Sequence, residues 1–443
     1  MPCLVDTRSK ISLGVGDELV TSVPDKKDSL CQQDDQSQGD DTPTSSGPDL
    51  PEDIWCLVHS LMPLCDSAHS ACVSRTFLRS WRCHPKLIFT EETLGLKRTE
   101  ARDFTSRVNQ ILKNHSDTGV KILEFVFDDC NNVNTCHLNS WLQKAVTPGI
   151  EKITLFLPWR YREEYNFPCS ILLDGRGNSI CYLDLTNCAF HPMVGFDCLR
   201  SLTKLRLYGV CITGDELGHL ISNCFALEEL QVWCCMELIC LTIPFWLQRL
   251  SCLTVSECNM LRVIESTAPN LTTLDFFGEP VQLVLRESSK TVNTPMVADK
   301  FLDIKHLNIH LGEDDDDAVT PTYDYLSLAS FLDACPVLES FTLSVDQSDM
   351  QHESVFGDPS LFLRQILQHE HERLKKVQII GFCSAKSLVE LTCDILKNAT
   401  SLESLTLDCI FGAGTGAISD SVRCGPSKSG KCWIRSRADL GST

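Results

Sequence analysis

The feature that most constrains this chain is an apolar pattern, L-x-x-L-x-L with apolar substitutions, that recurs between Val120 and Ile410. Its fourth and sixth positions are two residues apart, the period at which a β-strand presents one face. Each instance therefore predicts a short strand whose alternate residues point into a common interior. The eleven instances are Ile122–Phe127, Ile150–Leu155, Ile180–Leu185, Leu202–Leu207, Leu227–Val232, Leu250–Val255, Leu271–Phe276, Ile304–Ile309, Leu338–Leu343, Leu374–Ile379 and Leu402–Leu407.

The spacing of these segments indicates a stacked repeat. Their fourth positions, from Phe125 to Leu405, follow one another at intervals of 21 to 36 residues. Periods of roughly 20–29 residues are typical of leucine-rich repeats, and the longer intervals indicate insertions. A single unit cannot close its own core, so stacked units bury a continuous one. We expect an α/β repeat fold over residues 120–410, a leucine-rich-repeat solenoid (horseshoe).

The 25 cysteines fit this repeat. The pattern takes Asn or Cys three residues after its last strand position, where Cys130, Cys188, Cys235 and Cys258 stand. Three more, Cys211, Cys383 and Cys409, miss that position by one. No C-x-x-C pair occurs, so the commonest zinc-site spacing is absent. We expect small buried thiols and no metal.

A different kind of sequence precedes the repeats. Ile54, Leu57, Val58 and Leu61 form the stripe of an amphipathic helix behind Pro51. Pro63 ends it, Asp66 can cap a second short helix, and Phe77 and Trp81 lie one turn apart on a third. Three short helices in about 40 residues make a core that is marginal alone. This unit is expected to need a neighbour or a partner.

The remaining segments are expected to lie outside the folded repeats. We interpret residues 1–47 as a disordered acidic and polar tail and residues 91–119 as a linker. Residues 313–317, Glu-Asp-Asp-Asp-Asp, predict a solvated acidic loop, and residues 411–443 an irregular C-terminal tail.

Charge and hydropathy exclude several classes of protein. The net charge of -20 argues against nucleic-acid binding, which needs a basic face. The mean hydropathy is -0.04, and no run approaches the roughly 18 apolar residues of a membrane span. The first residues, Met1–Asp6, lack the form of a secretory signal. We expect no membrane partner, a reducing compartment, and localisation in the cytoplasm and/or nucleus.

Residues 48–90 resemble an F-box. Leu50-Pro51-Glu52-Asp53-Ile54 is similar to its opening, and Leu61–Asp66 and Ala71–Arg75 are similar to its middle and third helix. Ser74–Pro85 is similar to the corresponding stretch of plant F-box proteins with leucine-rich repeats. Two positions depart from the family: His69 stands where arginine is frequent, and Phe77 where tryptophan is frequent.

The resemblance implies a non-catalytic substrate receptor of an SCF-type ubiquitin ligase. In that family the F-box binds a Skp-type adaptor, which leads to a cullin and a RING protein, and the repeats hold a target protein. By position, the adaptor contacts would be Leu50, Pro51, Ile54, Leu57, Val58, Leu61 and Val73. The alternatives are that these side chains only fill the helical core, that the chain is a repeat scaffold outside a ligase, or that a small molecule completes the receptor.

The target would lie on the outward positions of the repeat strands. Tyr208, Trp233 and Phe277 occupy the same position in three repeats, and exposed aromatic and Arg side chains are typical of binding hot spots. The other reading is that insertions cover these aromatics as ordinary core. The proposed target-binding residues are Arg206, Tyr208, Gln231, Trp233, Phe277, His306 and His310.

Motifs with possible chemistry are weak. Gly425–Lys431 matches G-x-x-x-x-G-K, but Cys432 replaces the Ser or Thr that binds magnesium, and no apolar strand precedes it. Cys130, Cys136 and His137 are too few for a metal site, and His369–Glu372 lacks the H-E-x-x-H spacing. We therefore expect no catalytic residue and no cofactor.

Overall fold

The computed structural model describes residues 51–96, 101–116, 119–127, 134–161, 165–193, 196–278, 303–311, 324–345, 354–355, 364, 370–409 and 431–435. These residues fall in one compact unit, Leu50–Thr443. Several predictions concern positions outside the described residues. They are the tail 1–47, Leu50, Cys130, the acidic loop 313–317, His369, and residues 425–430 of the G-x-x-x-x-G-K match.

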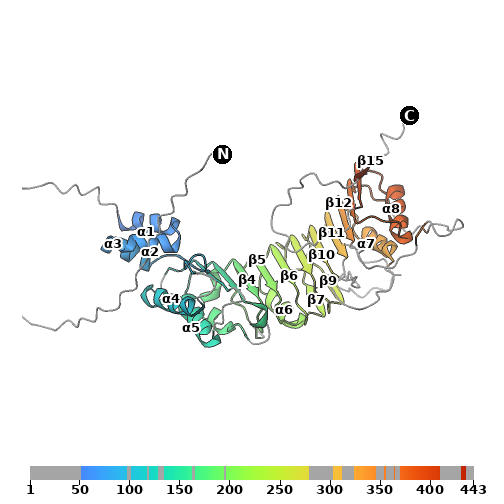
Figure 1. Ribbon diagram of the computed structural model, residues 1–443. Coiled ribbons are helices and arrows are strands. Elements are labelled where there is room, and N and C mark those ends of the chain that lie inside the picture. The colour runs from blue at the N-terminus through green and yellow to red at the C-terminus, as the bar shows by residue number, and fades with distance from the viewer. Residues whose placement is uncertain are drawn as a thin grey trace, which may run out of the picture. The chain divides into compact units, whose positions relative to one another are not determined.

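Three short helices open the described chain: α1 (Glu52–Leu61), α2 (Leu64–Ala71) and α3 (Arg75–Arg82) (Figure 1). Pro51 and Pro63 precede α1 and α2. The Ser74 hydroxyl caps α3 by accepting a hydrogen bond from the Phe77 amide at 3.2 Å. Prolines and a cap thus set the starts of all three helices.

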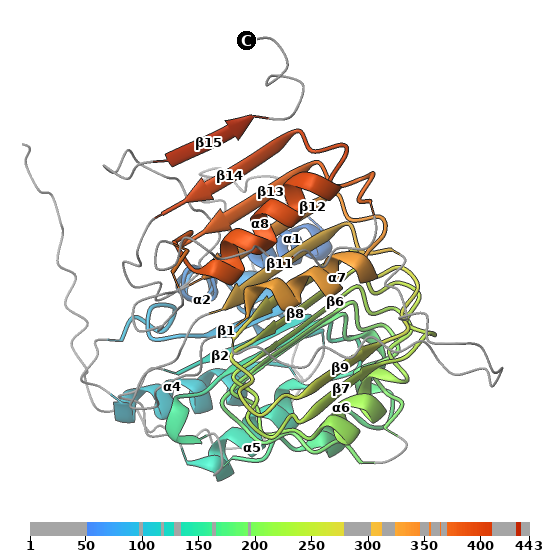
Figure 2. The same cartoon turned by 90° about the vertical axis from the view of Figure 1, so that its right-hand side faces the viewer.

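The rest of the unit is built on one thirteen-stranded sheet with the order β1-β2-β3-β4-β5-β6-β8-β10-β11-β12-β13-β14-β15 (Figure 2). All neighbours pair in parallel except β14 and β15, which are antiparallel. The strands are β1 (Lys86–Phe89), β2 (Ile122–Val126), β3 (Lys152–Phe156), β4 (Tyr182–Thr186), β5 (Lys204–Tyr208), β6 (Glu229–Trp233), β8 (Cys252–Ser256), β10 (Thr273–Phe277), β11 (His306–Leu311), β12 (Ser340–Val345), β13 (Lys376–Ile380), β14 (Ser404–Asp408) and β15 (Lys431–Arg435).

Alternation within the strands separates a buried face from an outward one. In β6, Leu230 and Val232 are buried, whereas Glu229, Gln231 and Trp233 point outward. The buried face packs against the connections between the strands. For example, Phe125 of β2 stacks on Trp141 of α5 (Thr135–Ala145), with the ring centroids 5.8 Å apart. These connections contain α4 (Ala101–Asn114), α5 (Thr135–Ala145), α6 (Gly214–Ile221), α7 (Ala329–Ala334), α8 (Lys386–Asn398) and the two-stranded sheet of β7 (Cys240–Ile243) and β9 (Val263–Ser266). Short 3₁₀ helices span Trp159–Tyr161, Cys169–Leu172, Arg176–Ser179 and Tyr325–Leu328.

A single hydrophobic core runs from Leu64 in α2 to Leu407 in β14. It has this form because each repeat leaves its apolar face open to the next one. The fold is therefore a three-helix motif followed by a leucine-rich-repeat array.

Cysteines line the turn that follows several strands. Cys188, Cys235 and Cys258 are buried at the repeat position where they were expected. The Cys235 thiol lies 3.8 Å from the Leu207 carbonyl oxygen, and the Cys258 thiol lies 3.7 Å from the Val232 oxygen. These two thiols therefore bond to the preceding repeat, and we call Cys188, Cys235 and Cys258 the cysteine ladder. Burial raises the pKa of the Cys188 thiol, so it stays protonated at neutral pH.

The structure corrects the sequence analysis in the first repeat. Leu123, not Phe125, is the partner of Ile153, so the predicted register was two residues late. The error kept the correct face because a two-residue shift preserves strand alternation. In the corrected register, the position at which the repeat takes a cysteine is residue 128 instead of Cys130.

Elements of the repeat array also lie in segments that were expected to be F-box, linker or tail. Strand β1 lies inside the range assigned to the F-box, and it pairs with β2 as a repeat strand. The presumed linker 91–119 contains α4, whose Phe104, Val108 and Leu112 are buried in the common core. The C-terminal tail is not wholly irregular, because β15 pairs with β14.

Candidate functional site

The apolar stripe of α1 faces outward. The exposed fractions are 40% for Ile54, 56% for Leu57, 39% for Val58 and 75% for Leu61. Val73, which follows α2, is 79% exposed, and Pro51 is also exposed. These side chains do not fill the helical core, so the core-filling alternative does not describe them. We call this set the α1 surface.

The opposite side of α1 supplies the packing. His59 is buried, and its ring packs edge-on against Phe77 with the ring centroids 5.1 Å apart. The Trp55 ring contacts the same phenylalanine at a centroid distance of 4.7 Å. Phe77 thus joins α1 to α3 although the family often has tryptophan there. His69 is exposed, with its Nδ1 4.0 Å from the Cys65 thiol, and takes no part in this packing.

Histidines connect the helices to the start of the repeats. Nε2 of His84 donates to the carbonyl oxygens of His59 at 3.0 Å and Met62 at 3.2 Å, at the C-terminal end of α1. Nε2 of His115, just after α4, donates to the His84 carbonyl oxygen at 2.9 Å. Burial and the nearby His84 lower the pKa of His59, which keeps its ring neutral at pH 7.

The outward face of the sheet carries the predicted target-binding residues in three rows. Strand pairing places Arg206 beside Gln231, and Tyr208 beside Trp233. It also places Trp233 beside Ser256, Ser256 beside Phe277, and Phe277 beside His310. His306 is exposed in another row, where its Nδ1 lies 2.8 Å from the Ser340 hydroxyl. The sequence-predicted register is therefore correct across these strands.

Several charged side chains on this face are paired with one another or lie against an aromatic ring. The Tyr182 ring lies between Lys152, 4.8 Å from its centroid, and Arg206, 5.8 Å from it. The Tyr182 hydroxyl donates to Asp184 at 3.0 Å. Burial, reinforced by Asp184, raises the pKa of Tyr182 to about 12. Lys204 Nζ forms an ion pair with Glu229 Oε2 at 2.7 Å, and Arg206 Nη2 lies 3.9 Å from Oε1 of the same carboxylate.

The third row, at the carboxyl end of the strands, is aromatic. The ring centroids of Tyr208 and Trp233 lie 6.2 Å apart, and those of Phe277 and His310 lie 5.7 Å apart. Tyr208 remains 39% exposed, whereas Trp233 and Phe277 are half-buried. Two further exposed aromatics, Phe156 on β3 and Trp159 after it, were missed. Phe156 occupies the third row and could have been found from the register.

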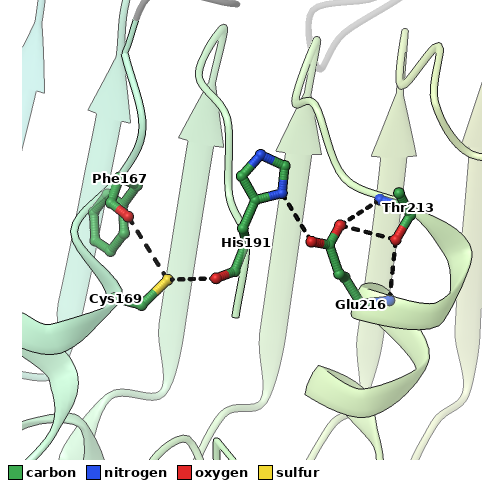
Figure 3. A network of polar contacts seen from close by, with 5 residues as sticks. All are labelled: Phe167, Cys169, His191, Thr213 and Glu216. Carbon is green, nitrogen blue, oxygen red and sulfur yellow. Dashed lines mark hydrogen bonds and ion pairs between the residues drawn. The ribbon is translucent and has the colours of Figure 1, made fainter. Parts of the chain in front are cut away.

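A polar network crosses the turns after β3, β4 and β5 (Figure 3). His191 Nδ1 lies 2.9 Å from a Glu216 carboxylate oxygen, and the other oxygen accepts from the Thr213 amide at 2.9 Å. Although burial opposes its ionisation, hydrogen bonds from Thr213 and His191 lower the pKa of Glu216. Cys169 points its thiol at the carbonyl oxygens of Phe167 and His191.

This network has the composition of a nucleophilic site but not its geometry. The Cys169 thiol contacts the main chain of His191 instead of its ring (Figure 3). Burial raises the pKa of that thiol to about 11, whereas a reactive cysteine needs a lowered pKa. The network is therefore a helix cap and a link between repeats.

The described residues form neither a metal-ligand cluster nor a membrane-spanning helix. Among the residues described, no three His, Cys, Asp or Glu side chains gather closely enough to hold a metal ion. Cys136 is exposed, and the His137 ring stacks on Trp141 at 6.0 Å. None of the helices within the described ranges combines the length and the apolar character needed to cross a bilayer.

Comparison with known proteins agrees with this architecture. Residues 48–89 match the F-box domain, and residues 111–292 and 282–442 match the At1g61320/AtMIF1 LRR domain. The fold and these matches define a plant F-box protein with leucine-rich repeats. By the extent of the repeat match, the chain belongs to the At1g61320/AtMIF1 leucine-rich-repeat family.

Individual proteins are also similar to the chain. F-box/LRR-repeat protein At3g03360 of Arabidopsis thaliana is 21% identical over 379 residues, covering 83% of this chain and 71% of that protein. An internalin from Listeria monocytogenes overlaps 68% of this chain and 94% of its own, with 13% identity and a TM-score of 0.20. A TM-score this low supports no structural argument.

Proposed function

We propose that this chain is the substrate-recognition subunit of an SCF-type ubiquitin ligase. Helices α1–α3 bind a Skp-type adaptor, which connects the chain to a cullin and a RING protein. The outward sheet face holds the protein to be ubiquitinated. The chain itself contributes binding and positioning, and the conjugating enzyme performs the chemistry.

The α1 surface is the observation that carries this proposal. Four apolar side chains on one short helix are exposed, while the same helix buries a histidine on its other side. Contiguous exposed apolar side chains mark interaction sites in soluble proteins. An adaptor that covers Leu57 and Leu61 would remove this apolar area from water, which favours binding.

The sheet face supports the second half of the proposal. It presents an aromatic row beside paired charges, the composition of a protein-binding surface. Every cysteine whose side chain the structure describes is a free thiol. Free thiols suit a reducing compartment, which supports action in the cytoplasm or nucleus.

Adaptor binding provides the test. Full-length chain is co-purified with a plant Skp-type adaptor, and its affinity is compared with that of the double variant Leu57→Ala/Leu61→Ala. Loss of a hot spot should weaken binding at least about thirtyfold, equivalent to about 2 kcal/mol. Both side chains are exposed, so the variant should unfold at the same temperature as the wild type.

Ile239→Ala is the matched control, because Ile239 is 58% exposed but precedes β7, outside the helical motif. It should leave adaptor affinity unchanged. If the folded wild type fails to bind any adaptor, the ligase role is wrong, and the chain is a repeat scaffold outside a ligase.

A further inference from the structure

Three exposed aromatic side chains lie at the carboxyl ends of β3 and β5. Phe156 is 43% exposed, Trp159 is 53% exposed, and Tyr208 is exposed as well. Phe156 and Tyr208 share the third row of the outward face, with Thr186 of β4 between them. Thr186 is buried, so the side chains around it close over that strand. We call Phe156, Trp159 and Tyr208 the aromatic patch, which is an exposed surface.

The turn after β3 brings Trp159 to the end of β5. A Cβ at Gly209 would lie 3.3 Å from Cζ3 of the Trp159 ring, so the ring approaches the glycine that directly follows Tyr208. The lack of a side chain at Gly209 permits this approach. Exposed apolar side chains gathered in this way mark interaction sites, and Trp and Tyr are frequent among the residues that dominate binding energy.

Arg206 adds an accessible cation to the aromatic patch. It lies two residues before Tyr208 on the same face of β5, and its side chain is 42% exposed, against 18% for its ion-pair partner Glu229. The two carboxylate oxygens of Glu229 already contact Lys204 and the Gln231 side chain. Arg206 Nη2 lies 3.9 Å from this carboxylate, beyond the roughly 3.2 Å limit of a good N–H···O hydrogen bond. The guanidinium therefore keeps donors available for a ligand.

Among the described residues, the exposed charge around the aromatic patch is positive. Lys152 on β3 is more exposed than its ion-pair partner Glu124, and Arg160 beside Trp159 is exposed. Asp184 on β4 is half-buried, and burial raises the pKa of its carboxyl group. Charges are screened beyond about 8 Å at physiological ionic strength, so these local cations outweigh the net charge of -20 at the patch. An acidic partner is the electrostatic complement of such a surface.

We propose that the aromatic patch and Arg206 bind an acidic segment of the target protein. A carboxylate of this segment accepts hydrogen bonds from the Arg206 guanidinium, whose planar fork suits a carboxylate. An apolar side chain next to that carboxylate packs on Trp159 and Tyr208. This inference rests on the proposed function, whose target-binding face it specifies.

Peptide binding is followed through one tryptophan. Full-length protein carrying 5-fluorotryptophan is titrated with N-acetyl-Glu-Phe-Glu amide at low salt and observed by ¹⁹F NMR. The Trp159 resonance is assigned as the signal missing from Trp159→Phe, and it should shift saturably with the peptide. The nearly isosteric, uncharged N-acetyl-Gln-Phe-Gln amide should bind roughly threefold to fivefold more weakly, the effect of an exposed ion pair. N-acetyl-Glu-Ala-Glu amide, which lacks the ring, should also bind more weakly than the first peptide.

Two variants locate the charge that the peptide recognises. Arg206→Gln should bind the acidic and the neutral peptide equally, with its affinity for the neutral peptide unchanged. Arg262→Gln removes the same charge from an exposed position just before β9 and should retain the wild-type preference. A disturbed fold would weaken both peptides together, so the ratio of the two affinities separates recognition from folding. In the wild type, about 1 M salt should remove the preference without any substitution.

Four results would overturn the proposal: no saturable shift, equal binding of acidic and neutral peptides by the wild type, a preference that persists in Arg206→Gln, or a shift confined to tryptophans other than Trp159. Equal binding of the alanine peptide would overturn the role of the aromatic patch. The titration contains no adaptor, so its failure leaves the ligase role untouched. Failed adaptor binding likewise leaves the peptide result untouched.

Discussion

Individual residues at the carboxyl ends of the strands adopt a left-handed backbone. The φ angles are 54° at Asn187, 60° at Gly209, 54° at Cys234 and 51° at Glu257. Each amide donates to a carbonyl of the next strand, as Gly209 does to Trp233 at 2.7 Å. Non-glycine residues pay roughly 1–2 kcal/mol for this conformation. The repeat geometry therefore imposes the turn even where the residue type disfavours it.

Gly209 permits a residue-scale prediction. A methyl group there would meet the Asn187 carboxamide. An alanine at this position would also have to adopt a positive φ angle. Gly209→Ala should lower the free energy of unfolding by about 2 kcal/mol, measured by urea denaturation.

Gly218→Ala is the matched control, because Gly218 lies in α6 and an added Cβ there has no atom within 4 Å. It should be neutral or stabilising by up to about 1 kcal/mol. Equal destabilisation by both substitutions would contradict the role assigned to the turn.

At the scale of single elements, α6 has a complete N-terminal cap. The Thr213 hydroxyl and the Glu216 carboxylate bond reciprocally to each other's main chain, and His191 adds a contact from the preceding repeat. The cap therefore fixes the start of the helix and joins two repeats at once.

The cap makes stability depend on pH. The folded-state pKa of Glu216 lies below the usual 4.5, so its stabilisation is present above pH 4.5 and is lost as pH falls through the folded value. Glu216→Gln should therefore be less stable than wild type at pH 7, and the difference should shrink below pH 4.5. Thermal unfolding at pH 3 to 7 measures this.

Asp215→Asn serves as the control for the cap. It removes a charge from the same helical turn but leaves the reciprocal hydrogen bonds between Thr213 and Glu216 in place. A wild-type advantage over Glu216→Gln that persists unchanged at pH 3 would contradict the argument.

The repeat pattern predicts most elements of the sheet, and individual residues explain the exceptions. The pattern does not identify strand β1 because His84 stands where a repeat would carry its first leucine. The first-repeat register slips because Leu123, Phe125 and Phe127 are all apolar and of the same parity. Strands β7 and β9 lie between predicted strands, where the pattern specifies nothing.

The candidate site could be predicted only in part. Strand alternation places Trp233, Phe277 and Arg206 outward, as observed. The helical period of α1 identifies an apolar stripe but not the direction it faces. In this motif His59 and Trp55 occupy the interior side, and the stripe points to solvent.

At the scale of the whole molecule, the sheet ends at β15. Its antiparallel pairing with β14 covers main-chain groups that would otherwise form an open edge. Open edges of parallel sheets pair readily with other chains. The C-terminal segment therefore supplies part of the cap that a repeat array requires.

Deleting residues 431–443 should expose β14 and cause self-association. Analytical ultracentrifugation should detect dimers or larger species at micromolar concentration, whereas deletion of residues 436–443 alone keeps β15 and should leave the sedimentation unchanged. A shortened chain that sediments like the wild type would show that β15 is dispensable for protecting the edge.

The cysteine ladder also equips the molecule with internal reporters. Cys188, Cys235 and Cys258 belong to different repeats, and their buried thiols can be alkylated only when their own repeat opens. Exposed thiols such as Cys72 and Cys136 would react at once and set the unprotected rate. Timed alkylation followed by peptide mass spectrometry would thus rank the local opening of these repeats without introducing a label.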